Sequence, residues 1–438
     1  MLVRPGRLGT IGRTRGLVLP PPALNALRII ATSGRIPNAQ VTSATLGTRR
    51  SYKTRQPEFI GAGCTEGFRL YFDRWSMQNG IVLPVGDEVL QQVSVSLDDG
   101  TTWAKVTFGG ADSLTLASGA KQVPSDIVTP SMLGLTTFAR GRKLWIKIVG
   151  NHPAGSDMLL HVGAKMTGGY SAYFDPATQS PTAYSAANFT FVSGENVQNL
   201  GRGATCLIGR PDSASAGAVI GLGDSILDGA NDTLTSMRST GFGYFQAAQV
   251  GASDADPIPG LNLTRNGTTT AHWLNATART YWEPYLAYAT MVVDNLGTND
   301  FGTGPGSGAA AALDTAIRQL WEIYRTNGIG KILRTKLQPR SSNASGTSAA
   351  SQTIAAGWDV GGQRDIFNAG LASALSAGTI DALVDLNTVW EDQAALGRWV
   401  TNATTNYATV DGTHPSAALH TLSAPILRSA ILANGSFV

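Results

Sequence analysis

The chain has 438 residues, of which 42% are hydrophobic and 14% are charged, and its formal net charge is +3. This composition is typical of a globular protein and excludes a disordered one, and the length is sufficient for two hydrophobic cores. Because the basic residues are scattered and the net charge is small, we expect no nucleic-acid site. No apolar run approaches the ~20 residues that a membrane span requires.

The N-terminal residues 1–15 are basic and glycine-rich, and prolines at positions 20–22 interrupt the apolar stretch that follows them. A signal peptide needs a continuous apolar region of about 7–15 residues. We therefore predict no export signal and a soluble protein that is cytoplasmic or associated with a virion. The two cysteines, Cys64 and Cys206, do not fix a redox compartment, and we expect both to be packing residues.

Short runs that mostly alternate between apolar and polar residues occupy the first part of the chain, and turn residues separate them. These runs are 68–72, 93–96, 103–108, 144–149 and 188–191. Such alternation predicts half-buried strands. Asp99 and Gly100 accept the positive φ angles of a tight hairpin turn. We therefore expect a jelly-roll-like all-β sandwich over residues 1–212.

Three tryptophans in this part, Trp75, Trp103 and Trp145, are candidate stacking surfaces for sugar rings. Aromatic residues in alternating strands more often belong to a core. Two interpretations therefore stay open: a sandwich that binds carbohydrate, and one that only packs against the second half of the chain.

A small, polar segment, 209–217, leads into the apolar run 219–222 and predicts a division into the domains 1–212 and 213–438. From here strands and helices alternate, which predicts a parallel sheet with helices on its faces. Gly223, Asp224 and Ser225 follow the first strand directly. Ligands bind at the carboxyl ends of such strands, so the Ser225 hydroxyl is a candidate nucleophile.

Two further predicted strands end in glycine and amide residues. The run 261–264 is followed by Gly267, and the run 291–296 is followed by Gly297, Thr298, Asn299 and Asp300. Apolar residues at helical spacing predict an amphipathic helix over 309–326. The run 382–385 predicts the last strand, and the segments 302–308 and 341–353 predict loops near the site.

A carboxylate and an imidazole, Asp411 and His414, lie three residues apart near the C-terminus. They must lie on a loop, because Gly412 separates them and Pro415 follows. This pair supplies a general base and a group that orients it. The other histidines are not spaced with cysteines or acids as metal ligands are, so we expect no metal and no cofactor. His272, five residues after Gly267, is a candidate lining residue, although a packed or solvated role is commoner.

Four segments resemble, in order and strand context, the sequence blocks of the SGNH hydrolases, also called GDSL esterases and lipases: Gly223-Asp224-Ser225, Gly267, Gly297-Thr298-Asn299-Asp300 and Asp411-Gly412-Thr413-His414. The resemblance covers the C-terminal half, from about Ala218. Ile226 replaces the leucine of the family name, a conservative change. The resemblance implies a flavodoxin-like, three-layer α/β domain and a carboxylic ester hydrolase.

The resemblance also implies a role for each site residue. Ser225 attacks the ester carbonyl, His414 takes its proton and returns it to the leaving alcohol, and Asp411 fixes the tautomer of His414. The backbone N–H groups of Ser225 and Gly267 and the side-chain amide of Asn299 form the oxyanion hole.

The accessory sandwich and the family analogy favour short acyl esters, O-acetyl groups on carbohydrate first, so the partner is an acylated small molecule or a polysaccharide. A lipid esterase or a thioesterase is the nearest alternative. A different class of function is a phage tail or surface protein that uses the fold to bind glycans. The composition, rich in glycine, alanine and threonine, and the expected lack of an export signal keep that alternative open, and a virion component can also be an esterase.

Overall fold

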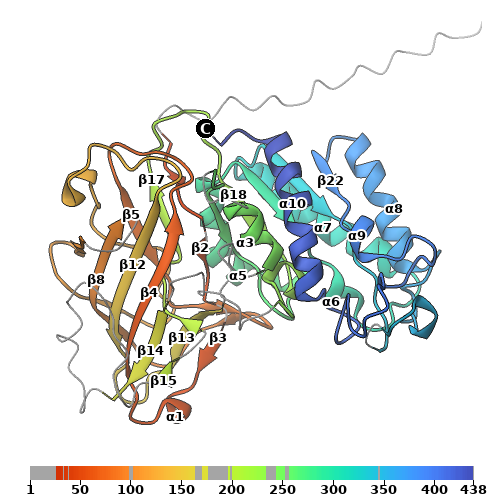
Figure 1. The fold of residues 1–438 in the computed structure, drawn as a ribbon, viewed down its shortest axis with the longest axis horizontal. Helices are drawn as coiled ribbons and strands as arrows, with labels where there is room; N and C mark the ends of the chain where they lie inside the picture. The colour runs from red at the N-terminus through yellow and green to blue at the C-terminus, as the bar shows by residue number, and fades with distance from the viewer. Residues whose placement is uncertain are drawn as a thin grey trace, which may run out of the picture.

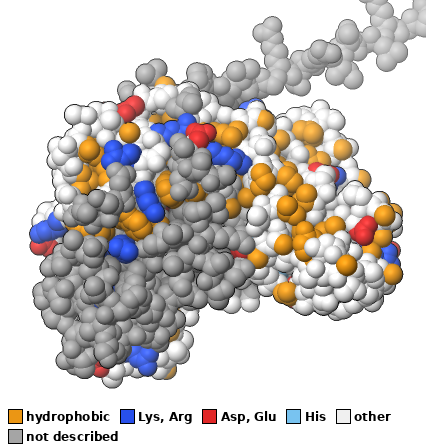
Figure 2. Space-filling view, in the orientation of Figure 1, with side chains coloured by type: hydrophobic (Ala, Val, Ile, Leu, Met, Phe, Trp, Pro, Cys, Tyr) orange, Lys and Arg blue, Asp and Glu red, His pale blue; other side chains and the backbone are white. Residues whose placement is uncertain are grey.

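The computed structural model describes residues 26–32, 34–37, 39–97, 102–162, 170–175, 196–197, 200–232, 243–251, 256–343 and 346–437. A β part and an α/β part lie side by side (Figure 1). Within these ranges, no helix has the length and apolar character needed to cross a membrane. Figure 2 shows hydrophobic side chains scattered over the visible face of the α/β part, and Lys and Arg mostly over the β part.

Antiparallel strands build the β part. The larger sheet has the order β10 (Leu114–Leu116), β8 (Glu88–Leu97), β12 (Lys143–Asn151), β4 (Ser51–Phe59), β14 (Tyr170–Phe174) and β15 (Asn196–Val197), with β9 (Ala104–Val106) paired to β8. The smaller sheet has the order β1 (Arg28–Ile29), β17 (Cys206–Gly209), β5 (Phe68–Phe72) and β11 (Val123–Pro124). Val93, Ile146 and Leu70, from both sheets, lie in one core, so the all-β architecture predicted here is present.

Shorter strands complete this part: β3 (Ala39–Val41), β13 (Met158–Val162) and β16 (Leu200–Gly201) form a further sheet, and β6 (Ser76–Met77) and β7 (Ile81–Val82) form a ribbon. The antiparallel pairing of β8 with β9 confirms the predicted hairpin. The hairpin turn, 98–101, and the predicted strand 188–191 lie outside the described residues.

The candidate stacking tryptophans differ in burial. Trp75 is fully buried in a hydrophobic core, which excludes it as a stacking surface and agrees with the core role that is commoner for such residues. Trp145 is 7% exposed, with Arg55 and Lys143 at 4.9 and 4.5 Å from its ring centre. Trp103 is half-buried, with the Lys147 ammonium 4.3 Å from its ring centre. Both cysteines are free and lie in hydrophobic cores, as predicted.

A parallel sheet forms the centre of the α/β part. Its order is β2 (Gly34–Arg35), β19 (Gly260–Asn262), β18 (Val219–Leu222), β20 (Met291–Asp294), β21 (Lys331–Thr335) and β22 (Ala382–Val384). Without β2, the strands have the chain order 2-1-3-4-5, which is the flavodoxin-like order. The order reverses at β18, the strand that leads to Ser225.

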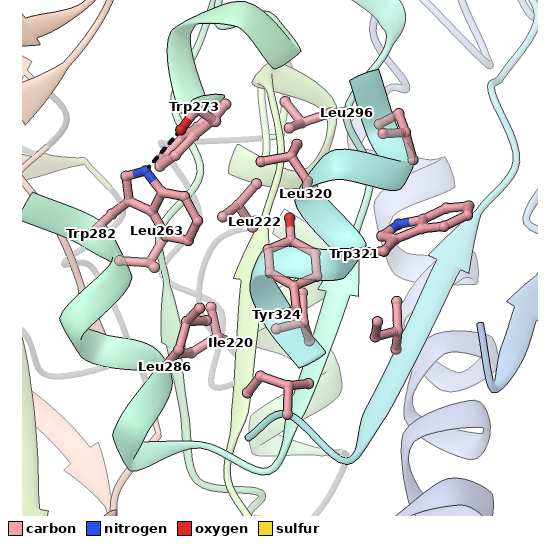
Figure 3. Packing of buried hydrophobic residues seen from close by; sticks show 14 of the residues in the cluster. Ile220, Leu222, Leu263, Trp273, Trp282, Leu286, Leu296, Leu320, Trp321 and Tyr324 are labelled. Atoms are coloured by element: carbon pink, nitrogen blue, oxygen red, sulfur yellow. Dashed lines mark hydrogen bonds between the residues drawn. The ribbon is translucent and has the colours of Figure 1, made fainter. Parts of the chain in front are cut away.

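Helices cover both faces of this sheet (Figure 1). Val219 packs with α3 (Gly243–Val250) and α10 (Ala417–Asn434), whereas Ile220 packs with α4 (Thr270–Leu274), α5 (Ala276–Trp282), α7 (Ala309–Thr326) and α8 (Gln363–Ser376). Figure 3 shows Trp321 and Tyr324 of α7 on the face of the sheet to which Ile220 points. On that face, Trp282 Nε1 donates to the backbone oxygen of Trp273 at 3.1 Å. The bounds of α7 confirm the predicted helix. The short helices are α1 (Ser43–Leu46), α2 (Ser225–Asp228), α6 (Thr298–Phe301) and α9 (Asn387–Trp390).

The two parts share structural elements. Strand β2 comes from the N-terminal range but pairs in parallel with β19 of the α/β sheet. Along β5, Leu70 faces the sandwich core and Tyr71 faces the core that contains Ile220. The smaller β-sheet is therefore packed on both faces, once within the sandwich and once against the α/β part.

Candidate active site

The residues on either side of the turn 223–225 explain how it presents the candidate nucleophile, Ser225. All residues of β18 are buried, and Asp224 Oδ1 accepts the backbone N–H of Ile226 at 3.0 Å, which caps α2. A Cβ on Gly223 would lie 3.0 Å from the Leu227 Cβ, so a larger residue would require α2 to shift slightly. The turn presents Ser225 at the carboxyl end of the sheet, where it is 4% exposed.

The structure brings Ser225, His414 and Asp411 together. Ser225 Oγ lies 2.8 Å from His414 Nε2, and His414 Nδ1 lies 2.6 Å from Asp411 Oδ2. The Asp411 Oδ1 atom accepts the backbone N–H groups of Thr413 and His414, both at 2.9 Å. These distances place a base within reach of a hydroxyl proton and a carboxylate in position to fix the tautomer of that base.

The Asp411 carboxylate is held in its charged form. Partial burial opposes ionisation, but hydrogen bonds from the His414 ring and from the backbone N–H groups of His414 and Thr413 outweigh it and lower the Asp411 pKa. A carboxylate of this kind stays an acceptor for the imidazole well into the acidic range.

The pKa of Asp224, the residue before Ser225, is raised, whereas that of Asp411 is lowered. Burial raises the pKa of Asp224 to about 6, although the Ile226 N–H and the nearby His414 act against the rise. The second carboxylate oxygen of Asp224, Oδ2, is buried without a hydrogen-bond partner among the described residues. Asp224 therefore lies in an environment that disfavours its charge.

The predicted oxyanion residues lie on the loops next to the nucleophile turn. The backbone N–H of Arg265 and the hydroxyl of Thr268 both reach the carbonyl oxygen of Gly223, each at 3.2 Å, so the loop that contains Gly267 runs beside Ser225. Asn299 Nδ2 donates to the Thr268 carbonyl at 3.0 Å. The Asn299 amide has a second N–H, which is the group that an oxyanion would need.

Three residues near the site were not found from the sequence. Asn231 Nδ2 donates to Asp411 Oδ2 at 3.0 Å. The Ser341 N–H and Trp399 Nε1 donate to the Gly412 carbonyl at 2.9 and 3.1 Å. The segment 341–353 had been predicted only as a loop near the site, and no local pattern marks Asn231 or Trp399.

The candidate lining residue His272 instead accepts the backbone N–H of Thr269 through Nδ1 at 3.0 Å and so caps the start of α4. His161 is buried and accepts the Gly203 N–H at 3.1 Å, and His420 is buried in α10. In the described ranges, no three His, Cys, Asp or Glu residues are grouped so as to hold a metal ion.

No protein-family model and no curated protein matches the chain. Among solved structures, it is similar to a GDSL-like lipase from Bacteroides thetaiotaomicron, with 18% identity over 49% of this chain and 88% of that chain and a TM-score of 0.34. An acetylxylan esterase from Geobacillus stearothermophilus has 16% identity over 49% and 93% of the two chains and a TM-score of 0.33. A member of the lipolytic G-D-S-L family from Veillonella parvula has 14% identity over 49% and 98% and a TM-score of 0.34.

Proposed function

We propose that the protein is a serine esterase that hydrolyses short acyl esters. The observation that carries this proposal is the continuous hydrogen-bonded chain from Ser225 Oγ through the His414 ring to Asp411 Oδ2, with distances of 2.8 and 2.6 Å. A serine hydroxyl is a weak nucleophile unless a base is positioned to take its proton, and that arrangement is present here.

The first half of the reaction forms an acyl-enzyme. Ser225 Oγ bonds to the carbonyl carbon while its proton moves to His414 Nε2, and the carbonyl π electrons become the oxyanion. In the proposal, the N–H groups of Ser225, Gly267 and Asn299 stabilise this charge. The oxyanion then re-forms the carbonyl, the ester C–O bond breaks, and the leaving alcohol takes the proton from His414.

The second half repeats these steps with water. His414 takes a proton from the water as its oxygen attacks the acyl carbon, and the bond to Ser225 Oγ breaks as Ser225 regains a proton. The products are the carboxylic acid and free enzyme. Asp411 stays ionised throughout and stabilises the protonated imidazole.

We further propose O-acetyl groups on carbohydrate as the substrate. The His414 and Asp411 side chains are 23% and 41% exposed, and such an open site suits a small acyl group carried by a bulky alcohol. The β part, which packs against the α/β part, is the second support for this choice, because an additional domain offers surface for a long substrate.

The test is hydrolysis of p-nitrophenyl acetate and of acetylated xylan by the wild type, by Ser225→Ala and by the control Ser131→Ala, which changes an exposed serine in another part of the chain. We expect Ser225→Ala to lower kcat by at least about a thousandfold and Ser131→Ala to have no effect. Equal rates for the wild type and Ser225→Ala on every ester tested would overturn the proposal and favour a glycan-binding role.

A further inference from the structure

The Asp411 carboxylate accepts a second side-chain hydrogen bond besides that of His414. Asn231 Nδ2 lies 3.0 Å from Asp411 Oδ2, the same oxygen that lies 2.6 Å from His414 Nδ1. Among the described residues, Asn231 is the one side chain outside the segment 409–414 that hydrogen-bonds to Asp411. Its amide therefore acts on the very oxygen that orients the catalytic base.

The backbone that carries Asn231 continues directly from the nucleophile helix. Gly229, with a φ of 97°, caps the C-terminal end of α2, and the N–H of Ala230 bonds to the Ser225 carbonyl at 3.0 Å. Asn231 has a φ of 65°, in the left-handed region, which asparagine adopts more readily than most residues. This conformation lets the chain turn back at the end of the helix, with the Asn231 amide at Asp411.

Neighbouring contacts hold this turn in place. His420 Nε2 of α10 lies 3.0 Å from the Ala230 carbonyl oxygen, and Asp232 Oδ2 accepts the N–H of Gly243 at 2.8 Å. Both helices that cover this face of the sheet, α3 and α10, therefore contact the residues next to Asn231. The amide is presented from a fixed backbone, which lowers the entropic cost of its hydrogen bond.

The exposure of Asp411 explains why a second donor matters. The Asp411 side chain is 41% exposed, so water competes with His414 for its oxygens. Hydrogen bonds to an ionised acceptor are stronger than neutral ones. A donor fixed on Oδ2 keeps this oxygen facing His414 Nδ1.

We infer that Asn231 is a positioning residue of the site, which orients the Asp411 carboxylate and couples the nucleophile helix to the loop of the base. This inference rests on the proposed function. The neutral amide of Asn231 orients Asp411 without adding charge, whereas an aspartate at position 231 would place a second carboxylate beside His414.

The experiment compares variants that separate the amide from the backbone. Asn231→Gly keeps a residue that tolerates positive φ and removes the donor. Asn406→Gly is the matched control, because Asn406 is also exposed, has a φ of 60° and does not hydrogen-bond to Asp411. We expect Asn231→Gly to lower kcat on p-nitrophenyl acetate about 10- to 100-fold with little change in KM, and Asn406→Gly to match the wild type.

Asn231→Asp tests whether the side chain at position 231 lies close enough to the Asp411–His414 pair to act on it. The added negative charge favours the protonated imidazole, so the acid limb of the kcat/KM profile should move to higher pH. Asp411 on the loop of His414, Asp224 before Ser225, and Arg340 after β21, which acts on both of these carboxylates, are unchanged in this variant.

Two results would overturn the inference. One is wild-type kcat in Asn231→Gly; the other is an unmoved acid limb in Asn231→Asp. Failure of the proposed function is distinguishable, because it would appear in the wild type as a rate no higher than that of Ser225→Ala. In that case, proton NMR still tests the Asn231–Asp411 hydrogen bond through the downfield resonance of His414 Nδ1–H. This resonance should weaken in Asn231→Gly and persist in Asn406→Gly. An unchanged resonance in Asn231→Gly would reject the positioning role.

Discussion

Arg35 and Asp228 form a buried ion pair that joins an N-terminal strand to the nucleophile helix. Arg35 Nη1 lies 3.2 Å from Asp228 Oδ1, and Nη2 donates to the Asp228 backbone oxygen at 3.0 Å. The two side chains are only 7% and 5% exposed. Ser225 begins the helix that Asp228 ends, so the position of the proposed nucleophile depends on a residue of the first part of the chain.

Arg35→Met should destabilise the protein by about 3 kcal/mol, because it removes the cation that pairs with the buried Asp228 carboxylate and leaves Thr264 and the nearby Arg265 to compensate that charge in part. Urea unfolding measures this loss. The control is Arg210→Met, which breaks an exposed pair with Glu66 and should cost no more than about 1 kcal/mol. Equal losses in the two variants would show that the Arg35 pair has no special role.

A fragment of residues 213–438 tests the predicted division into two domains. We expect the isolated fragment to lack a cooperative unfolding transition, because it loses β2 from the edge of its sheet and exposes the core surface that Tyr71 and Ile208 cover. Near-UV circular dichroism and binding of a hydrophobic dye measure this. A fragment that unfolds cooperatively with native-like spectra would instead support two independent domains.

The sequence predicted the elements whose signal is local. The strand 219–222 is a continuous apolar run before a glycine turn, and α7 repeats apolar residues at helical spacing, so each is visible within its own segment. Asp411 and His414 were found together because they share one short loop. Strand β2 was not found, because two residues carry no periodicity and the pairing partner is remote. Asn231 and Asp411 are 180 residues apart, and no local pattern brings them together.

Asn299→Ala tests the proposed oxyanion hole. Removing one such donor typically lowers kcat by about 10²–10³-fold, and KM should change little because the charge develops only in the transition state. The exposed residue Asn79 of the β part gives a control, Asn79→Ala, which should keep the wild-type kcat. Steady-state kinetics on p-nitrophenyl acetate measures both. An Asn299→Ala enzyme with wild-type kcat would remove this amide from the mechanism.

Asp224 should make stability fall as the pH rises from about 4 to about 6. Its pKa is raised to about 6 by burial, whereas an unfolded aspartate titrates near 3.9. Between these values the folded protein holds a proton that the unfolded chain has lost, so rising pH favours unfolding. At about 1.4 kcal/mol per pKa unit, the cost above pH 6 is on the order of 3 kcal/mol.

Asp224→Asn isolates this contribution, because its Oδ1 can still accept the Ile226 N–H while the titrating group is gone. The unfolding free energy of the wild type, taken relative to Asp224→Asn, should therefore decrease between pH 4 and pH 7 by this amount, and the contributions of the other titrating groups should largely cancel. Denaturant unfolding at several pH values measures the difference. A difference that stays constant with pH would mean that Asp224 ionises as readily in the folded protein as in the unfolded chain. Its buried position argues against this, as does its Oδ2 atom, which has no hydrogen-bond partner in the described part of the chain.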